Sequence, residues 1–189
     1  MTVLRTPLPA GHSRAVLSAG SNVGDPMATL RMVPDGFAAA GPDIRVVAVS
    51  DVYATAPWGG VEQDDFCNIT VVVEGKREPH DWLRIGAGLE QLAHRTREVR
   101  WGPRTLDVDV ITVETVDGTV RSDDPDLTLP HPRAHQRAFV LLPWLQIDPD
   151  AELLTETGSR RVDELSAALP ADERDGVRRI GPLARSEVR

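Results

Sequence analysis

The chain of 189 residues has a single cysteine and a single lysine. Cys67 alone cannot form a disulfide within the chain or a cysteine zinc cluster, and its apolar neighbours favour a buried thiol over a nucleophile. Lys76 is equally isolated, which excludes a P-loop or Schiff-base lysine at any other position. Because no apolar run approaches the roughly 20 residues of a transmembrane helix, no membrane span is expected.

The sequence also has little that would direct it out of the cytoplasm. Residues Met1–His12 lack the apolar core of a signal peptide, so we expect a reduced, cytoplasmic location. The net charge of −8 at pH 7 repels nucleic acids and anionic membranes. We therefore expect no nucleic-acid or membrane partner. We also expect small-molecule substrates and a monomer.

Positive charge is nevertheless concentrated in one short segment. It contains Arg95, Arg97, Arg100 and Arg104, with only Glu98 opposing them. In an acidic chain an anion site has to be a local basic patch, and this segment predicts one. A non-enzymatic module that binds nucleic acid through these arginines is a second interpretation, against which the overall charge argues.

Two carboxylates follow the basic segment directly. Asp107 and Asp109 alternate with Leu106, Val108 and Val110, a pattern that predicts a strand with both carboxylates on one face. Such residues lie roughly 6–7 Å apart and repel each other unless a cation lies between them. Mg²⁺ fits, because it takes hard oxygen ligands and shares them with substrate phosphates. Since arginine forks match phosphate oxygens, the whole stretch predicts a metal-and-polyphosphate site.

The simpler interpretation of this stretch is an exposed strand whose aspartates are solvated. The turn formed by Trp101, Gly102 and Pro103 separates the two charge clusters. A tryptophan, a glycine and a proline together are hard to explain as part of a solvent face. The turn therefore favours the functional interpretation.

Hydrophobic periodicity and turn residues divide the chain into alternating strands and helices. Strands are expected at 14–19, 44–53, 66–74 and 106–114, and helices from 26, at 79–94 and at 134–145. Asp25 should cap the first helix, and Pro34 and Gly36 should kink or end it. This βαββαβ order is that of a ferredoxin-like α+β sandwich, with helices packed on a mainly antiparallel sheet. We expect one domain at 14–150, with 151–189 as a tail packed on it.

Two further groups of residues are candidates for ligand contacts. Phe66 and Asn68 share a strand face and could bind a heterocycle through an aromatic plate and an amide, although Phe66 alone is more readily a core residue and Asn68 alone is as readily structural. His131 lies between two prolines and is followed by Arg137. This pair could contact phosphate, although His131 alone is more readily structural.

These pieces together resemble one family, the 6-hydroxymethyl-7,8-dihydropterin pyrophosphokinases of folate biosynthesis. The resemblance covers roughly residues 16–150, and its most specific motif is Arg-Trp-Gly-Pro-Arg-Thr-Leu-Asp-Val-Asp at 100–109. It is also carried by Gly20-Ser21-Asn22, Tyr53–Pro57, Gly59, Gln63, Phe66, Asn68, Arg95, Arg97, Pro130–Arg133, Arg137 and Phe139.

The resemblance implies a transfer of pyrophosphate from ATP to the pterin, with release of AMP. Two Mg²⁺ ions would be held by Asp107 and Asp109. Phe66 and Phe139 would sandwich the pterin ring. The residues that would read its edge are Asn68, Thr55, Ala56 and Trp58.

The nucleotide would be bound by the remaining motif residues. Those implied to hold phosphates are Arg95, Arg97, Arg100, Arg137 and His131. Those implied to shape the nucleotide pocket are Trp101, Arg104 and Val110. We expect the arginine segment to close over ATP. A different Mg²⁺-dependent nucleotidyltransferase on the same sandwich is the alternative, and it would release pyrophosphate instead of AMP.

Overall fold

The computed structural model describes residues 6–56, 64–93 and 105–183. Its first half contains β1 (Ser13–Ser21), α1 (Pro26–Ala39), β2 (Arg45–Val49), β3 (Val52–Thr55), β4 (Phe66–Gly75), α2 (Pro79–Leu92) and β5 (Asp107–Thr115). It continues with β6 (Gly118–Thr119), β7 (Ser122–Asp124), β8 (Leu127–Leu129), the 3₁₀ helix η1 (Ala134–Gln136) and α3 (Ala138–Ile147). The last elements are β9 (Glu152–Thr155), β10 (Gly158–Arg161), α4 (Val162–Ala168), α5 (Ala171–Asp175) and β11 (Val177–Gly181).

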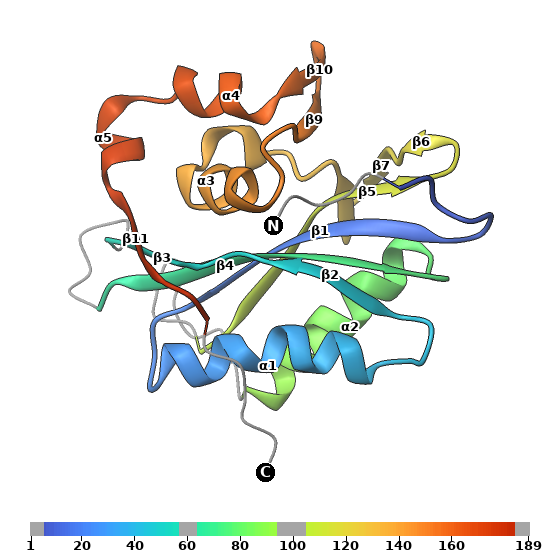
Figure 1. Cartoon of the computed structure of the whole chain (residues 1–189), viewed down its shortest axis with the longest axis horizontal. Helices are drawn as coiled ribbons and strands as arrows, with labels where there is room; N and C mark the ends of the chain where they lie inside the picture. The colour runs from blue at the N-terminus through green and yellow to red at the C-terminus, as the bar shows by residue number, and fades with distance from the viewer. Residues whose placement is uncertain (1–5, 57–63, 94–104, 184–189) are drawn as a thin grey trace.

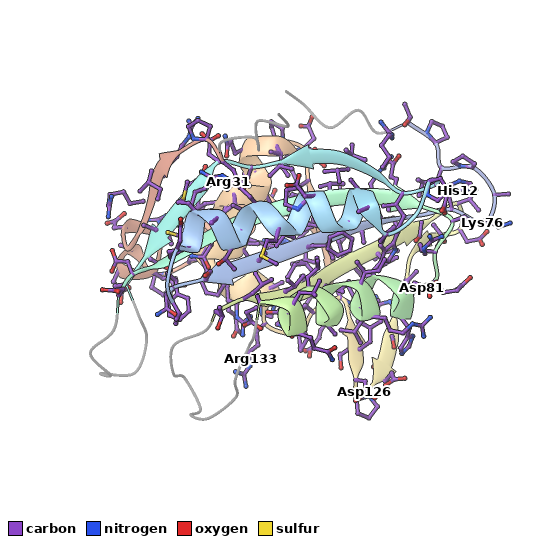
Figure 2. The ribbon with its side chains drawn as sticks, turned by 90° about the horizontal axis from the view of Figure 1, so that it is seen from below. His12, Arg31, Lys76, Asp81, Asp126 and Arg133 are labelled. Carbon is purple, nitrogen blue, oxygen red and sulfur yellow. The ribbon has the colours of Figure 1, made fainter. Side chains whose placement is uncertain are left out.

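A seven-stranded sheet organises these elements. Its strand order is β11-β3-β4-β1-β5-β6, with β2 also paired to β4, and neighbouring strands are antiparallel. Helices α1 and α2 lie side by side on one face, and α3 covers the other (Figures 1 and 2). The connection order and the central order β3-β4-β1-β5 are those of a ferredoxin-like fold, which confirms the expected fold class. Among the described residues, none of the helices has the length and apolar character of a membrane span.

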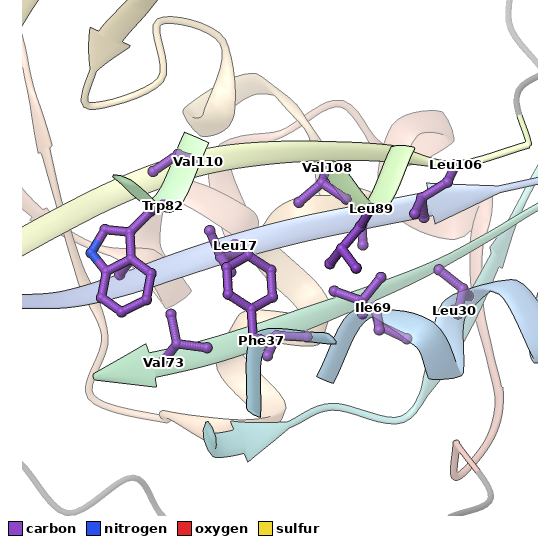
Figure 3. Packing of buried hydrophobic residues seen from close by; sticks show 14 of the residues in the cluster. Leu17, Leu30, Phe37, Ile69, Val73, Trp82, Leu89, Leu106, Val108 and Val110 are labelled. Atoms are coloured by element: carbon purple, nitrogen blue, oxygen red, sulfur yellow. The ribbon is translucent and has the colours of Figure 1, made fainter. Parts of the chain in front are cut away.

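Each face of the sheet has its own hydrophobic core. On the α1–α2 side, Leu17, Phe37 and Trp82 are among the fully buried side chains (Figure 3). The indole Nε1 of Trp82 donates a hydrogen bond to Ser13 Oγ at 2.8 Å, so its polar atom is satisfied although the ring is buried. On the α3 side, Val72 packs with Leu141 and other residues of α3 and α4.

The expected strand at 44–53 is two strands, β2 and β3. Val49 faces Val71, and Tyr53 faces Asn68. From the first pair to the second, the chain of β2 and β3 advances by four positions while β4 advances by three, so the β2–β3 side contains one additional residue. Ser50 bridges the irregularity, because its N–H donates to Thr70 O and its Oγ accepts from Thr70 N, both at 2.9 Å. A serine side chain that competes with the backbone ladder is a common way to interrupt a strand.

Of the two effects expected of Pro34 and Gly36, a kink or an end of the first helix, the end is not observed, because α1 continues to Ala39 with Pro34 inside it. Leu30, Val33 and Phe37 are buried on both sides of the proline, so packing outweighs the lost backbone hydrogen bond. Gly36 supports this packing, since a Cβ there would collide with the Leu89 side chain of α2. The Asp25 cap is confirmed by its acceptance of the Ala28 N–H at 2.9 Å.

The expected helix at 134–145 is also divided. A 3₁₀ turn covers Ala134–Gln136, Arg137 is extended with φ −121° and ψ 105°, and α3 begins at Ala138. Strand β1 is longer than expected, because Gly20 and Ser21 continue its ladder. The short strands β6, β7 and β8 follow the expected turn at Asp117–Gly118.

A β-bulge in β5 sets the faces of this strand. Leu17 faces Val110 and Val16 faces Thr112, which leaves Ile111 as the additional residue. Bulges shift the alternation of side chains beyond them. Glu114 can therefore lie on the same face as Asp109, although their position numbers differ by an odd number.

At the end of the sheet where β1 begins, the side chains of four neighbouring strands carry charges of alternating sign. Arg45, Glu74, Arg14 and Glu114 are consecutive cross-strand partners in β2, β4, β1 and β5. Arg14 is only 8% exposed and Glu74 9%. The Nε of Arg14 donates to Glu74 Oε1 at 2.7 Å, and Arg45 Nη2 donates to Oε2 at 2.5 Å. Glu74 therefore compensates a buried cation.

Burial alone would raise the pKa of Glu74, but the hydrogen bonds and charges of Arg45 and Arg14 lower it below its ordinary value of 4.5. A carboxyl group with a lowered folded-state pKa stabilises the fold above its unfolded-state pKa. That stabilisation is lost as pH falls through the folded-state pKa.

We predict that Glu74→Gln lowers the free energy of unfolding by about 2 kcal/mol at neutral pH, because hydrogen bonds to charged groups contribute about 1.5–3 kcal/mol. Urea unfolding at pH 7 and again at roughly pH 3 measures this, and the deficit should shrink in acid. The exposed Asp117→Asn, in the β5–β6 turn, is the matched control and should be neutral. An equal deficit of Glu74→Gln at both pH values would contradict the role of its charge.

Candidate active site

The side of the sheet that faces α3 carries the predicted site residues in two adjacent rows. One row contains Asn68, Gly20 and Asp107, and the next contains Thr70, Ser18 and Asp109, each in the order β4, β1, β5. Neighbouring strands lie about 4.8 Å apart, so β1 separates the amide and carboxylate positions by about 10 Å. The register thus brings both groups to one end of one face.

The glycine between them is required by close packing. A Cβ on Gly20 would lie 2.9 Å from the side-chain oxygen Oδ1 of Asn68, which is closer than a real Cβ contact. Gly20 therefore lets the amide lie over β1. It also leaves the surface of the sheet between Asn68 and Asp107 without a side chain.

Asn68 is 5% exposed and held by neighbouring strands. Its Nδ2 donates to Thr55 Oγ1 at 3.0 Å and to Tyr53 O at 3.3 Å. The amide nitrogen, which also lies 3.5 Å from Phe66 O, is thus held by protein acceptors, and Oδ1 remains as the acceptor over Gly20. A buried acceptor at this place is suited to reading a donor on a ligand.

Asp107 and Asp109 are both partly exposed, whereas Leu106, Val108 and Val110 are buried in the opposite core. The expected alternation is therefore confirmed at this end of β5. The Val110 side chain lies in the same core as Trp82 (Figure 3), so contact with a ligand on the α3 side would involve its backbone.

Two side chains from the segment before α3 approach Asp109. Its Oδ2 lies 3.3 Å from Arg137 Nη1 and 3.9 Å from His131 Nε2. The guanidinium carbon of Arg137 also lies 5.6 Å from the centre of the Phe139 ring, within cation–π range. Arg137 thus contacts both the Phe139 ring and the Asp109 carboxylate.

The hydrogen bonds of His131 define its protonation. Its ring Nδ1 accepts the Arg133 backbone N–H at 3.1 Å, and the backbone N–H of His131 donates to Ile111 O at 2.8 Å. Burial lowers the pKa of His131, although the charge of Asp109 opposes this effect. Because Nδ1 accepts a hydrogen bond, the hydrogen of a neutral His131 ring lies on Nε2, the nitrogen that faces Asp109. Arg133 itself is exposed at the surface (Figure 2).

The remaining predicted residues lie at the edge of this arrangement or outside the described residues. Phe66 is partly buried at the start of β4, opposite Thr55, and Ala56 is exposed directly after β3. The predicted residues outside the described part of the chain are Trp58, Arg95, Arg97, Arg100, Trp101 and Arg104.

Mg²⁺ fits the donors that are present. Within the described ranges, no group of three or more potential ligands forms a cage for a metal ion. Mg²⁺ commonly binds through one or two carboxylates, its remaining ligands being water and substrate phosphates. Asp107 and Asp109, partly exposed on one face, match such an open site.

Several residues that shape the site were not predicted. Gln146 of α3 accepts from Asp51 N at 2.8 Å and lies 3.4 Å from the Tyr53 hydroxyl. Glu173 of α5 accepts from Ala138 N at 3.2 Å. These partners are far apart in sequence, and no local pattern could have indicated them.

The sequence matches the family described as 7,8-dihydro-6-hydroxymethylpterin-pyrophosphokinase over residues 16–149. The chain belongs to this family. This pyrophosphokinase family includes proteins named 2-amino-4-hydroxy-6-hydroxymethyldihydropteridine pyrophosphokinase from Mycobacterium leprae and Mycobacterium tuberculosis. The first is 48% identical over 88% of this chain and 88% of its own length. The second is 44% identical over 90% of this chain and 91% of its own length.

Solved structures support the fold of this pyrophosphokinase. A variant of Plasmodium falciparum HPPK-DHPS with pterin and p-hydrobenzoate has a TM-score of 0.60 at 13% sequence identity and covers 89% of this chain. This chain spans about half of that longer protein, covering 48% of it. At this identity the likeness shows the fold alone.

We predict that Gly20→Ala lowers the free energy of unfolding by about 1–3 kcal/mol, the usual cost of overpacking, because the new Cβ displaces the Asn68 amide. Gly88→Ala is the matched control. A Cβ on Gly88 in α2 meets nothing within 4 Å, so alanine should stabilise this helix by about 0.5–1 kcal/mol. Urea unfolding measures both changes, and a neutral Gly20→Ala would contradict the packing argument.

Proposed function

We propose that the protein transfers pyrophosphate from ATP to the hydroxymethyl group of 6-hydroxymethyl-7,8-dihydropterin, in folate biosynthesis. The observation that supports this most directly is the pairing register, in which Asn68 and the two aspartates lie on one face with only β1 between them. A heterocycle held at the amide can then extend a substituent over Gly20 toward the carboxylates.

The reaction balances without a redox step. The hydroxymethyl oxygen forms a bond to the β-phosphorus of ATP, and the bond from that phosphorus to the bridging oxygen of the α-phosphate breaks. AMP leaves with the bonding electron pair, and the hydroxyl proton passes to solvent. Such a transfer depends mainly on positioning and charge compensation.

The residues around Asn68 would bind the pterin. Its Oδ1 would accept a hydrogen bond from the ring edge, while Thr55, Ala56 and Trp58 would contribute neighbouring contacts. Phe66 and Phe139 would stack on the two faces of the ring, because flat heterocycles pack well on aromatic plates. The hydrogen bonds from Asn68 to β3 would keep the amide in one orientation.

The residues around Asp109 would bind the polyphosphate. Asp107 and Asp109 would hold two Mg²⁺ ions, which neutralise phosphate charge when bound. Arg137 and His131 would donate hydrogen bonds to phosphate oxygens, and the hydrogen on His131 Nε2 suits that part. Arg95, Arg97 and Arg100 are proposed to hold further phosphates, with Trp101, Arg104 and the Val110 backbone beside the nucleotide.

The expected monomer and the cytoplasmic location remain predictions. The monomer is supported by the scattered positions of the large exposed apolar residues in the described ranges. They are Val23, Leu92, Val116 and Ile180, which lie in the β1–α1 loop, α2, the β5–β6 turn and β11, and they form no obvious patch for a second copy.

Product analysis tests the proposed function. The protein is incubated with Mg²⁺, ATP and 6-hydroxymethyl-7,8-dihydropterin, and the nucleotides and pterins are separated by chromatography. AMP and a diphosphorylated pterin in equal amounts are expected. Release of pyrophosphate instead would indicate a nucleotidyltransferase and overturn the proposal.

We predict that Asp107→Asn and Asp109→Asn each lower kcat by on the order of a hundredfold or more, the scale on which lost charge stabilisation acts. Both side chains are partly exposed, so the circular dichroism spectrum should not change. Asp117→Asn makes the same substitution beyond the far end of β5 and should keep full activity. If both site variants kept normal turnover, the assignment of the metal ligands would be wrong.

We predict that Asn68→Ala weakens pterin binding far more than ATP binding. A ligand donor that loses its buried acceptor costs about 1–3 kcal/mol, which corresponds to a rise of roughly fivefold to 150-fold in the pterin Kd. Calorimetry with each ligand separately measures the difference. Equal losses for pterin and ATP would mean that Asn68 acts only through the fold.

A further inference from the structure

The N-terminus of α3 is capped by a residue from the far end of the chain. The N–H of Ala138, the first residue of α3, donates to Glu173 Oε1 of α5 at 3.2 Å. Arg137 in the preceding N-cap position makes no side-chain capping hydrogen bond. Because the first N–H groups of a helix lack intrahelical acceptors and favour negative charge, Glu173 performs the task that a local cap performs elsewhere.

This cap lies between two residues of the candidate active site. Ala138 is fully buried, and its neighbours in the chain are Arg137 and Phe139. The Arg137 guanidinium lies over the Phe139 ring and 3.3 Å from Asp109 Oδ2. The orientation of the Ala138 peptide therefore sets the direction in which both side chains leave the backbone.

The segment that carries Glu173 is also attached to β3, the strand that holds the Asn68 amide. Strand β11 follows α5 directly and pairs with β3, with Val177 opposite Thr55 and Arg179 opposite Tyr53. Arg179 also forms an ion pair with Asp51, whose N–H donates to Gln146 of α3. Residues 171–181 thus connect β3 with the first turn of α3 (Figure 1).

We propose that Glu173 is a positioning residue of the active site, which holds Arg137 and Phe139 in their binding orientation through the Ala138 N–H. This inference rests on the proposed function, which assigns Phe139 to the pterin and Arg137 to phosphate. Glu173 itself contacts neither ligand. Its hydrogen bond to Ala138 takes the place of a local N-cap and also attaches the C-terminal segment to the site.

The test compares Glu173→Ala, which removes the acceptor, with Glu173→Gln, which keeps an oxygen at the same reach but removes the charge. The exposed Asp175→Ala, in the same helix, is the control for a lost acidic residue. Steady-state kinetics give kcat/KM for the pterin, and the intrinsic fluorescence of 6-hydroxymethylpterin reports its binding without turnover. Thermal unfolding is recorded for every variant.

We expect Glu173→Ala to lower kcat/KM and raise the pterin Kd by about tenfold each, the equivalent of about 1.4 kcal/mol, with Glu173→Gln and Asp175→Ala close to the parent. A lower melting temperature with unchanged kinetics and pterin binding would overturn the inference. So would equal losses in Glu173→Gln and Glu173→Ala.

Two further outcomes keep the test decisive. If Glu173→Ala does not fold, Glu173→Asp takes its place, because its shorter side chain withdraws the acceptor and should weaken pterin binding where Glu173→Gln does not. If the parent released no AMP, the proposed function would fail, while the fluorescence titration would still decide the role of Glu173.

Discussion

The position of β1 between β4 and β5 is the constraint on which the rest of the structure depends. Side chains alternate along a strand, so a slip of one residue in either pairing would move every side chain of that strand to the other face. Such a slip would expose Leu17 and its neighbours to the α3 side and bury Ser18 under α1 and α2. The apolar content of the two cores therefore fixes the register, and the register places the polar ends of three strands side by side.

The α3-facing side of the sheet consequently has three zones with different tasks. An alternating row of charges occupies one end, centred on Arg14 and Glu74. An apolar centre containing Val16 and Val72 packs against α3. The other end carries Asn68, Gly20 and the two aspartates. Because α3 covers the centre and begins beside Asp109, it closes the core and at the same time presents Arg137 and Phe139 to the polar end.

Much of this arrangement could be predicted from local sequence. The alternation around Asp107 and Asp109 gave the correct face of β5, and the capped start of α1 was correct, because both depend on neighbours in the chain. The division of β2 from β3 at Ser50 was missed, since it depends on the hydrogen bonds that Ser50 exchanges with Thr70. The extended Arg137 was missed because residues 134–145 have a helical pattern, and because Glu173, which caps the resulting helix, lies in a different part of the chain.

The bulge at Ile111 has a consequence for the length of β5. On its helix-facing side β5 contributes Val108, Val110 and Val113 to the core, and the last of these is in phase with the others only because of the additional residue. Loss of the codon for Ile111 would remove the bulge and restore simple alternation, so Val113 and Glu114 would keep their faces, whereas loss of the codon for Val108, where the ladder is regular, would turn Asp107 toward the α1–α2 core. Neighbouring points in the gene thus differ sharply in their tolerance of deletion, although both encode the same strand.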